Sequence, residues 1–149
     1  MRDYYADSSV LVKQHIQEVG TVWFTKLAAN NLIITSRISI VEVYSAFNRR
    51  VRENHLTRAD YAQLVADFEA LYLTEYQLIE LTLPIVKQAK YLLEQYSLRA
   101  YDATQLASAI HVNLSLQPLA NLIFLSADNR LLTAAQAEGL AIDNPNLYP

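Results

Sequence analysis

Cysteine is absent from this 149-residue chain and glycine is scarce, occurring only at Gly20 and Gly139. Without cysteine the chain has neither disulfides nor a thiolate zinc site, which is consistent with a reducing compartment and leads us to expect a cytoplasmic protein. Two isolated glycines cannot build the glycine-rich loop that cradles phosphates in dinucleotide-binding or Walker-type proteins. Any phosphate group must therefore be held by other means.

Long uncharged hydrophobic runs are also missing, so we expect a soluble protein without a membrane span or signal peptide. Hydrophobic residues make up 52% of the chain, which excludes disorder and predicts a single domain over residues 1–149. The 12 Lys and Arg residues are outnumbered by 15 Asp and Glu residues, for a formal net charge of -3. This balance argues against a general nucleic-acid coat protein and leaves open a site that holds cations.

Short apolar runs alternate along the chain with longer helical patterns. The expected strands are residues 4–6, 32–35, 77–81, 122–126 and 140–142. Because several are apolar throughout, we expect a mostly parallel sheet covered on both faces, and hence a three-layer α/β/α fold. The expected helix signals are a Ser39–Glu42 capping box, a start at Thr57 or Asp60, Pro84 in a first turn, a buried helix over 102–114, and a helix over 129–138 ended by Gly139.

Four carboxylates occupy unusual positions. Asp7 follows the first apolar strand, and Asp128 follows the fourth. Glu42 and Asp102 lie in apolar surroundings near expected helix starts, where the helix dipole favours an anion. In a parallel sheet these positions meet at the carboxyl edge, where open α/β folds bind ligands. Each acid alone could be an ordinary helix cap, but the four together predict one cleft.

Oxygen ligands without nearby cysteine or histidine favour Mg²⁺ or Mn²⁺ over zinc. Such sites support the attack of water on phosphodiesters. On this interpretation Asp7, Asp102 and Asp128 anchor the cation, and Glu42 either binds it through water or helps to deprotonate the attacking water.

The chain resembles the PIN-domain nuclease family, and within it the VapC-type toxins of bacterial toxin–antitoxin modules, in the segments YADSSVLVK, IVEVYSAF, YDATQLASAI and FLSADNRLLTAAQAEGL. The resemblance implies a PIN-like fold with a short five-stranded sheet and a metal-dependent endoribonuclease. It also implies an RNA substrate such as tRNA or mRNA, a homodimer, and an antitoxin protein that lies across the cleft.

Residue by residue, the resemblance assigns the four metal-binding acids to Asp7, Glu42, Asp102 and Asp128. Ser9 and Ser126 match hydroxyl residues that orient carboxylates or metal-bound water, although either could also serve a local turn. Some relatives carry a further acid where this chain has Arg130. The departure places a fifth carboxylate, and full occupancy of a second metal position, in question.

The strongest basic cluster follows the helix of Glu42 and contains Arg49, Arg50 and Arg52. It could guide an RNA backbone into the cleft, although a solvated helix end is the commoner role. Lys13 could touch a phosphate or lie on the surface. The remaining candidates are expected to be structural: ungrouped histidines at 15, 55 and 111, with 111 in the core, and core aromatics at 23, 24, 44, 47, 68 and 72.

Three alternatives remain open at the level of sequence. A haloacid-dehalogenase-like phosphotransferase would need a second aspartate at the position of Ser9. A catalytically inactive PIN-like binding module would be expected to lose acids that are all present here. A PIN-domain RNA-processing nuclease outside any toxin–antitoxin pair differs from a toxin in its biological setting rather than in these residues.

Overall fold

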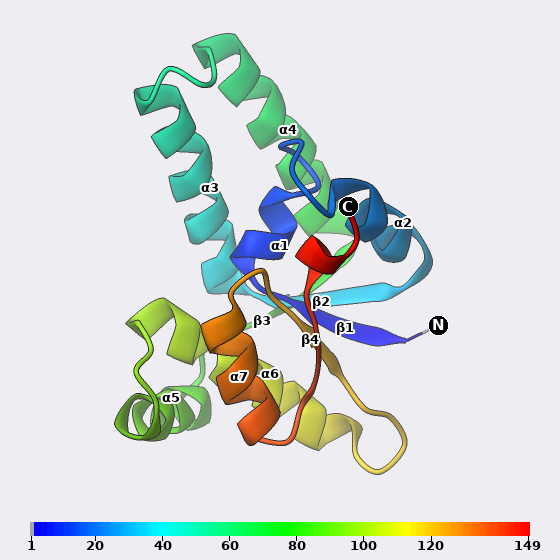
Figure 1. Ribbon diagram of the computed structural model, residues 1–149, viewed down its shortest axis with the longest axis vertical. Helices are drawn as coiled ribbons and strands as arrows, with labels where there is room; N and C mark the ends of the chain where they lie inside the picture. The colour runs from blue at the N-terminus through cyan, green and yellow to red at the C-terminus, as the bar shows by residue number, and fades with distance from the viewer. Residues whose placement is uncertain (1) are drawn as a thin grey trace.

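The computed structural model describes residues 2–149 and has a parallel β-sheet at its centre (Figure 1). Within these residues the sheet has five strands in the order β3-β2-β1-β4-β5, and every neighbouring pair is parallel. The strands are β1 (Asp3–Ala6), β2 (Leu32–Ser36), β3 (Tyr76–Ile79), β4 (Ile123–Leu125) and β5 (Ala141–Asp143). The expected parallel sheet is confirmed.

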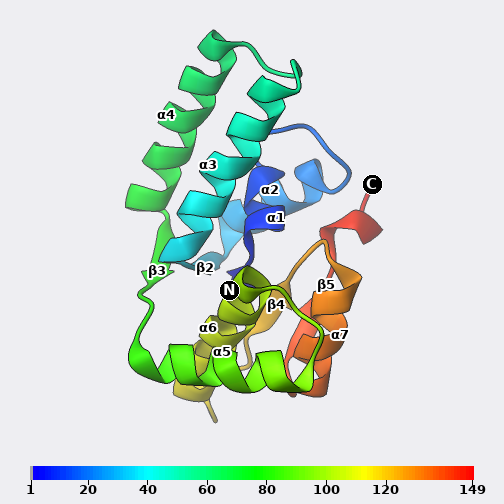
Figure 2. The ribbon, with the colours of Figure 1, turned by 90° about the vertical axis from the view of Figure 1, so that its left-hand side faces the viewer.

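Helices cover both faces of the sheet, which confirms the three-layer α/β/α arrangement. One face carries α1 (Ser8–Val12), α2 (Thr21–Asn30), α3 (Arg37–Arg52) and α4 (Arg58–Thr74). The other carries α5 (Leu83–Gln95), α6 (Ala100–Leu116) and α7 (Asn129–Ala137), and a 3-10 turn, η1 (Pro145–Leu147), follows β5. Figure 2 shows α3 and α4 side by side, extending well beyond the sheet. No helix among residues 2–149 is long and apolar enough to span a membrane.

Two hydrophobic cores lie on opposite faces of the sheet because the apolar strands present side chains to both. Beneath α1–α4, Phe24, Phe47 and Phe68 are fully buried, with Phe68 edge-on to Phe47. Beneath α5–α7, the buried ring of Tyr5 stacks on Phe124 at 5.6 Å between centroids. The expected packing of aromatic residues in the core is confirmed.

Local signals located most helix ends correctly. Thr57 and Asp60 form the reciprocal capping box of α4, with hydrogen bonds of 3.0 and 3.1 Å. Gly139 adopts the expected left-handed conformation, with φ of 92°, after α7. Strand β3 ends at Ile79 rather than residue 81, and Thr82 already occupies the N-cap position of α5.

The predicted capping box at Ser39 is wrong. Helix α3 begins three residues earlier, where the Ser36 hydroxyl accepts the backbone N–H of Ile38 at 3.2 Å. Ser39 is instead fully buried inside the helix. Glu42 therefore lies in the second turn of α3, beyond the first-turn amides that a capping residue would serve.

The chain order places a crevice between the neighbouring strands β1 and β4. From β1 the chain moves outward through β2 to β3, and it then returns to the other side of β1 for β4 and β5. The loops after β1 and β4 consequently diverge to opposite faces of the sheet, which is the topological switch point where open α/β sheets bind ligands.

Candidate active site

Asp7 stands at this switch point, directly after β1, and its carboxylate is almost fully buried. Oδ1 accepts the Ser9 hydroxyl at 2.5 Å and the backbone N–H of Val10 at 3.2 Å, while Oδ2 accepts the Ser126 hydroxyl at 2.6 Å. Burial raises the pKa of Asp7 to about 6, and the charge of Glu42 adds to this, although the three hydrogen bonds oppose it. Ionising the Asp7 carboxyl in the folded protein therefore lowers the free energy of unfolding.

Ser9 and Ser126 join Asp7 to the loop between β4 and α7. The Ser9 hydroxyl accepts the backbone N–H of Ala127 at 3.0 Å, and the Ser126 hydroxyl accepts that of Asp128 at 3.0 Å. Each serine thus accepts a backbone N–H of the loop after β4 and donates to the carboxylate of Asp7, which follows β1. The pair fixes the orientation of the Asp7 carboxylate and the backbone that carries Asp128.

Helix capping accounts for part of the conformation of two of the acids. Asp7 caps α1, and Asp128 caps α7 by accepting the backbone N–H of Arg130 at 2.9 Å. Asp102 is not a cap, because Arg99 occupies that position and Asp102 is the third residue of α6. Capping leaves oxygen lone pairs free on each carboxylate, so it is compatible with a role in binding.

Glu42 and Asp102 reach the same crevice from α3 and α6. Glu42 accepts the side-chain amide of Gln105 on Oε1 at 2.7 Å and the Ser8 hydroxyl on Oε2 at 3.2 Å. Desolvation raises the pKa of Glu42, and the charge of Asp102 raises it further against the effect of these hydrogen bonds. Asp102 pairs with Arg99, with 3.4 Å between Nε and Oδ2.

All four predicted carboxylates line a single cleft of about 530 Å³. Its lining includes Asp7, Ser8, Ser9, Glu42, Arg49, Arg99, Asp102 and Asp128. Ser126 is buried behind the cleft, where it contacts Asp7. In residues 2–149 no three His, Asp or Glu side chains are grouped closely enough to hold a metal ion. The carboxylates therefore share a cleft without forming a closed coordination shell.

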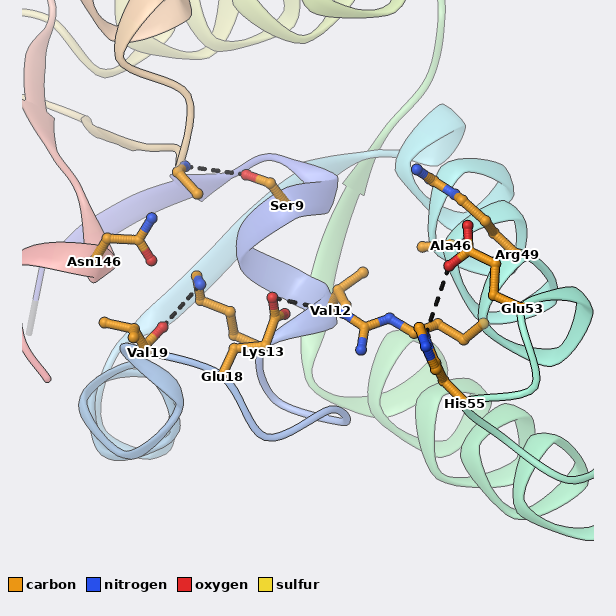
Figure 3. A pocket seen from close by; sticks show the side chains of 12 residues that line it. Ser9, Val12, Lys13, Glu18, Val19, Ala46, Arg49, Glu53, His55 and Asn146 are labelled. Carbon is orange, nitrogen blue, oxygen red and sulfur yellow. Dashed lines mark hydrogen bonds and ion pairs between the residues drawn. The ribbon is translucent and has the colours of Figure 1, made fainter.

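A second cavity of about 900 Å³ adjoins the cleft and shares four of its lining residues (Figure 3). Arg49 borders both cavities. Arg50 borders the second one and lies 3.8 Å from Glu18. Figure 3 shows the Glu53–His55 pair on the side of this cavity formed by α3. Arg52, the third member of the predicted basic cluster, borders neither cavity.

Of the two roles left open for Lys13, a place on the surface is wrong: the residue is 4% exposed and donates from Nζ to the carbonyl of Val19 at 2.8 Å. The expectation for His111 is also wrong. His111 is not in the core, because it lies on the exposed side of α6. His15 instead packs edge-on against Phe47 and Phe68.

Sequence reasoning did not find Ser8, Arg99 or Gln105, which all contact the predicted acids. Arg99 lies three residues before Asp102 and could have been found from that spacing, because such residues are neighbours on a helix. Gln105 lies three residues after Asp102 on the same helix face. Its contact with Glu42 spans 63 positions in the chain, and no local pattern reports that pairing.

A cleft lined by carboxylates at the switch point of a parallel α/β/α sheet defines a class of proteins that bind ligands with acidic residues at the carboxyl ends of their strands. A profile of the PIN domain matches residues 4–137. The chain belongs to the PIN-domain family.

Individual relatives are similar along nearly their whole length. Ribonuclease VapC49 of Mycobacterium tuberculosis is 30% identical over 146 residues, covering 97% of both chains. The crystal structure of VapC20, a sarcin–ricin loop cleaving toxin of the same organism, has a TM-score of 0.66 at 17% identity and covers 98% of this chain and 99% of its own. A toxin–antitoxin complex from Klebsiella pneumoniae has a TM-score of 0.57 at 18% identity, covering 95% and 97%.

Proposed function

We propose that this protein is a divalent-metal-dependent endoribonuclease and the toxin of a toxin–antitoxin pair. One observation carries the proposal: four carboxylates from separate segments of the chain line one cleft at the switch point of the sheet. Asp7 and Asp128 also cap helices that begin at this edge, but Glu42 and Asp102 are not caps and still line the same cleft. The similarity to a named VapC ribonuclease supports RNA as the substrate.

The donor set of the cleft fits a hard divalent cation. Its acidic side chains are four carboxylates, and neither cysteine nor histidine lines the cleft. The charges of Glu42 and Asp102 raise the pKa of their neighbours in the cleft, and a cation would relieve this repulsion. We propose that Asp7, Asp102 and Asp128 hold Mg²⁺ or Mn²⁺. When bound, the ion activates water and stabilises charge on phosphate oxygens.

The residues of the chain supply orientation and a proton acceptor. Ser9 and Ser126 hold the Asp7 carboxylate in one orientation. Glu42 is placed to accept the proton of the attacking water, because its carboxylate borders the cleft and its pKa is raised. The oxygen of water adds to phosphorus as the bond to the leaving oxygen breaks, the proton of the water passes to Glu42, and the leaving oxygen takes a proton from solvent.

Arg49 and Arg50 are placed to bind the RNA backbone beside the acids. Arg49 borders both cavities, so a strand that passes from the acidic cleft to the second cavity must pass this side chain. Arg50 extends the positive surface, although Glu18 partly neutralises it. Arg52 lines neither cavity, so we assign RNA contact to Arg49 and Arg50 alone.

The proposed partners follow from the toxin assignment. The similar complex from Klebsiella pneumoniae supports a protein antitoxin as partner. We propose that a segment of this antitoxin lies across the acidic cleft, that the toxin is a homodimer, and that it acts in the cytoplasm on cellular RNA.

Cleavage of total bacterial RNA by the purified protein tests the proposal. Cleavage should require Mg²⁺ or Mn²⁺, stop with EDTA, and fall at least about 100-fold in Asp128→Asn. Asp143→Asn is the matched control, because Asp143 ends β5 at the same sheet edge but does not line the cleft. Sequencing of the fragment ends identifies the target. Metal-independent cleavage, or equal activity of both variants, would contradict the proposal.

A further inference from the structure

A buried polar side chain connects the core to the acidic cleft. Gln105 on α6 is 1% exposed and uses its side-chain amide in three contacts. Nε2 donates to Glu42 Oε1 at 2.7 Å and to the Ser39 hydroxyl at 2.7 Å, while Oε1 accepts the Tyr5 hydroxyl at 2.6 Å. Both amide N–H groups and the carbonyl are therefore engaged.

The hydrogen-bond chain beyond Gln105 is also complete. Thr35 has one hydroxyl proton, which it donates to the carbonyl of Ala6 at 2.7 Å. The 2.7 Å contact between Thr35 and Ser39 is then a bond donated by Ser39, whose remaining lone pair accepts from Gln105. All of these hydroxyls are fully buried, so an unmade bond here would be costly.

This chain of contacts allows only one orientation of the amide. If the amide of Gln105 were reversed, its carbonyl oxygen would face the Glu42 carboxylate, and two acceptors would meet. In the observed orientation the Tyr5 hydroxyl donates to that carbonyl from a fully buried position in β1. Glu42 and Ser39 thus require the amide N–H groups on their side, and the Tyr5 hydroxyl holds the carbonyl end in place.

Glu42 needs such a support because its side chain is long and only half-buried. Its other contact, from the Ser8 hydroxyl, is longer at 3.2 Å. Gln105 shares a helix with Asp102, three residues away and on the same face, so α6 both carries one cleft acid and holds another.

We propose that Gln105 is a positioning residue for the reaction: it sets the orientation of the Glu42 carboxylate in the cleft, and the buried Tyr5 hydroxyl sets the orientation of Gln105. The inference rests on the proposed nuclease function and on the role of Glu42 in it. Gln105 and Tyr5 do not line the cleft, so neither contacts RNA there.

The test compares the fully buried Tyr5 with the half-buried Tyr76, which each donate to a glutamine at 2.6 Å. Tyr5 donates to Gln105, and Tyr76 donates to Gln14, which lines neither the cleft nor the adjoining cavity. Tyr5→Phe and Tyr76→Phe each remove one hydroxyl and keep the ring. We expect similar losses of thermal stability, but a kcat roughly 3- to 10-fold lower only in Tyr5→Phe, with KM within about twofold of wild type.

Two further variants complete the design. Gln105→Met, which keeps the length of the side chain but cannot donate to Glu42, should lower kcat by about 10- to 100-fold. Tyr5→Phe added to Glu42→Gln should have no further effect on kcat, because the group it positions is already inactive. In metal-free protein, NMR should show two distinct, slowly exchanging Nε2–H signals of Gln105 that broaden or average in Tyr5→Phe but not in Tyr76→Phe.

The outcomes separate the inference from the function on which it rests. Equal kcat losses in both tyrosine variants, or unchanged Gln105 amide signals in Tyr5→Phe, would overturn the positioning role. Full activity in Glu42→Gln would instead overturn the proposed role of Glu42. Loss of cleavage in Glu42→Gln, combined with a wild-type kcat in Tyr5→Phe, would refute the inference and leave the nuclease assignment intact.

Discussion

Replacing Asp7 by asparagine is expected to stabilise the metal-free fold while abolishing RNA cleavage. The Asp7 carboxylate is 5% exposed, and its pKa is raised from an ordinary 3.8 to about 6. Between these two values the folded state binds the proton more tightly than the unfolded state, so stability falls as pH rises. The cost of ionising Asp7 is absent below about pH 3.8 and complete above about pH 6.

The two pKa values differ by about two pH units, which corresponds to roughly 3 kcal/mol of unfolding free energy above pH 6. Asparagine keeps the helix cap with Val10 but turns an amide N–H toward one of the serine hydroxyls, at a cost of about 1 kcal/mol. We therefore expect Asp7→Asn to gain about 1–2 kcal/mol at pH 7.5, or roughly 3–6 °C in Tm. At pH 4 the gain should vanish or reverse.

Urea unfolding followed by circular dichroism, in EDTA, measures the stability difference between Asp7→Asn and wild type at pH 4 and at pH 7.5. Asp67→Asn, a change at an exposed carboxylate, is the control and should stay within about 0.5 kcal/mol of wild type at pH 7.5. Added Mg²⁺ should stabilise wild type but not Asp7→Asn. A variant that loses 1 kcal/mol or more at pH 7.5 would refute this reasoning and show that Asp7 is chiefly a structural cap.

Three further predictions concern the cleft, the RNA path and the fold. Glu42→Gln should reduce cleavage about 100-fold or more without loss of stability at pH 7.5, because desolvation already raises the pKa of this carboxyl; a marked drop in Tm would contradict this. Arg49→Ala should weaken RNA binding and lower the slope of log affinity against log salt by about 0.7–0.9, while Arg52→Ala should leave both unchanged in fluorescence anisotropy titrations. Both glycines have positive φ, but Gly20→Ala should lower the Tm by more than Gly139→Ala. A Cβ at Gly20 would collide with the backbone carbonyl of Pro145, whereas a Cβ at Gly139 meets open space. Equal losses of Tm would refute this difference.

The strands and the two acids that follow them could be predicted because their signals are local. Short apolar runs define buried strands wherever they occur, and in a parallel sheet the carboxyl ends of all strands lie at one edge. Asp7 and Asp128 were therefore placed together before any contact was known, and both line the cleft. Ser9 lies two residues after Asp7, so its contact with Asp7 also follows from a short stretch of chain. Ser126 reaches Asp7 across 119 positions, and that contact requires β1 and β4 to be neighbours in the sheet.

Errors arose where burial depends on a distant partner. Ser39 has the sequence signature of a cap, but contacts with Thr35 and Gln105 hold it inside α3. His111 lies in a largely apolar segment, yet its side chain is exposed on α6. Composition cannot show which side of a helix faces the sheet when most of its residues are small and apolar.

The amino-acid sequence by itself determined the class of fold, the sheet edge that carries the candidate site, and the place of Asp7 and Asp128 there, because strand burial and the position of an acid after a strand are properties of neighbouring residues. The apolar surroundings of Glu42 and Asp102 singled out the other two candidate acids. Only the tertiary structure decided which side chains hold those acids. It brought Gln105 to Glu42 and placed Arg49, but not Arg52, beside the two cavities. These pairings depend on how α3 and α6 pack across the sheet, and hydrogen bonds between residues far apart in the chain leave no periodic signal in the sequence.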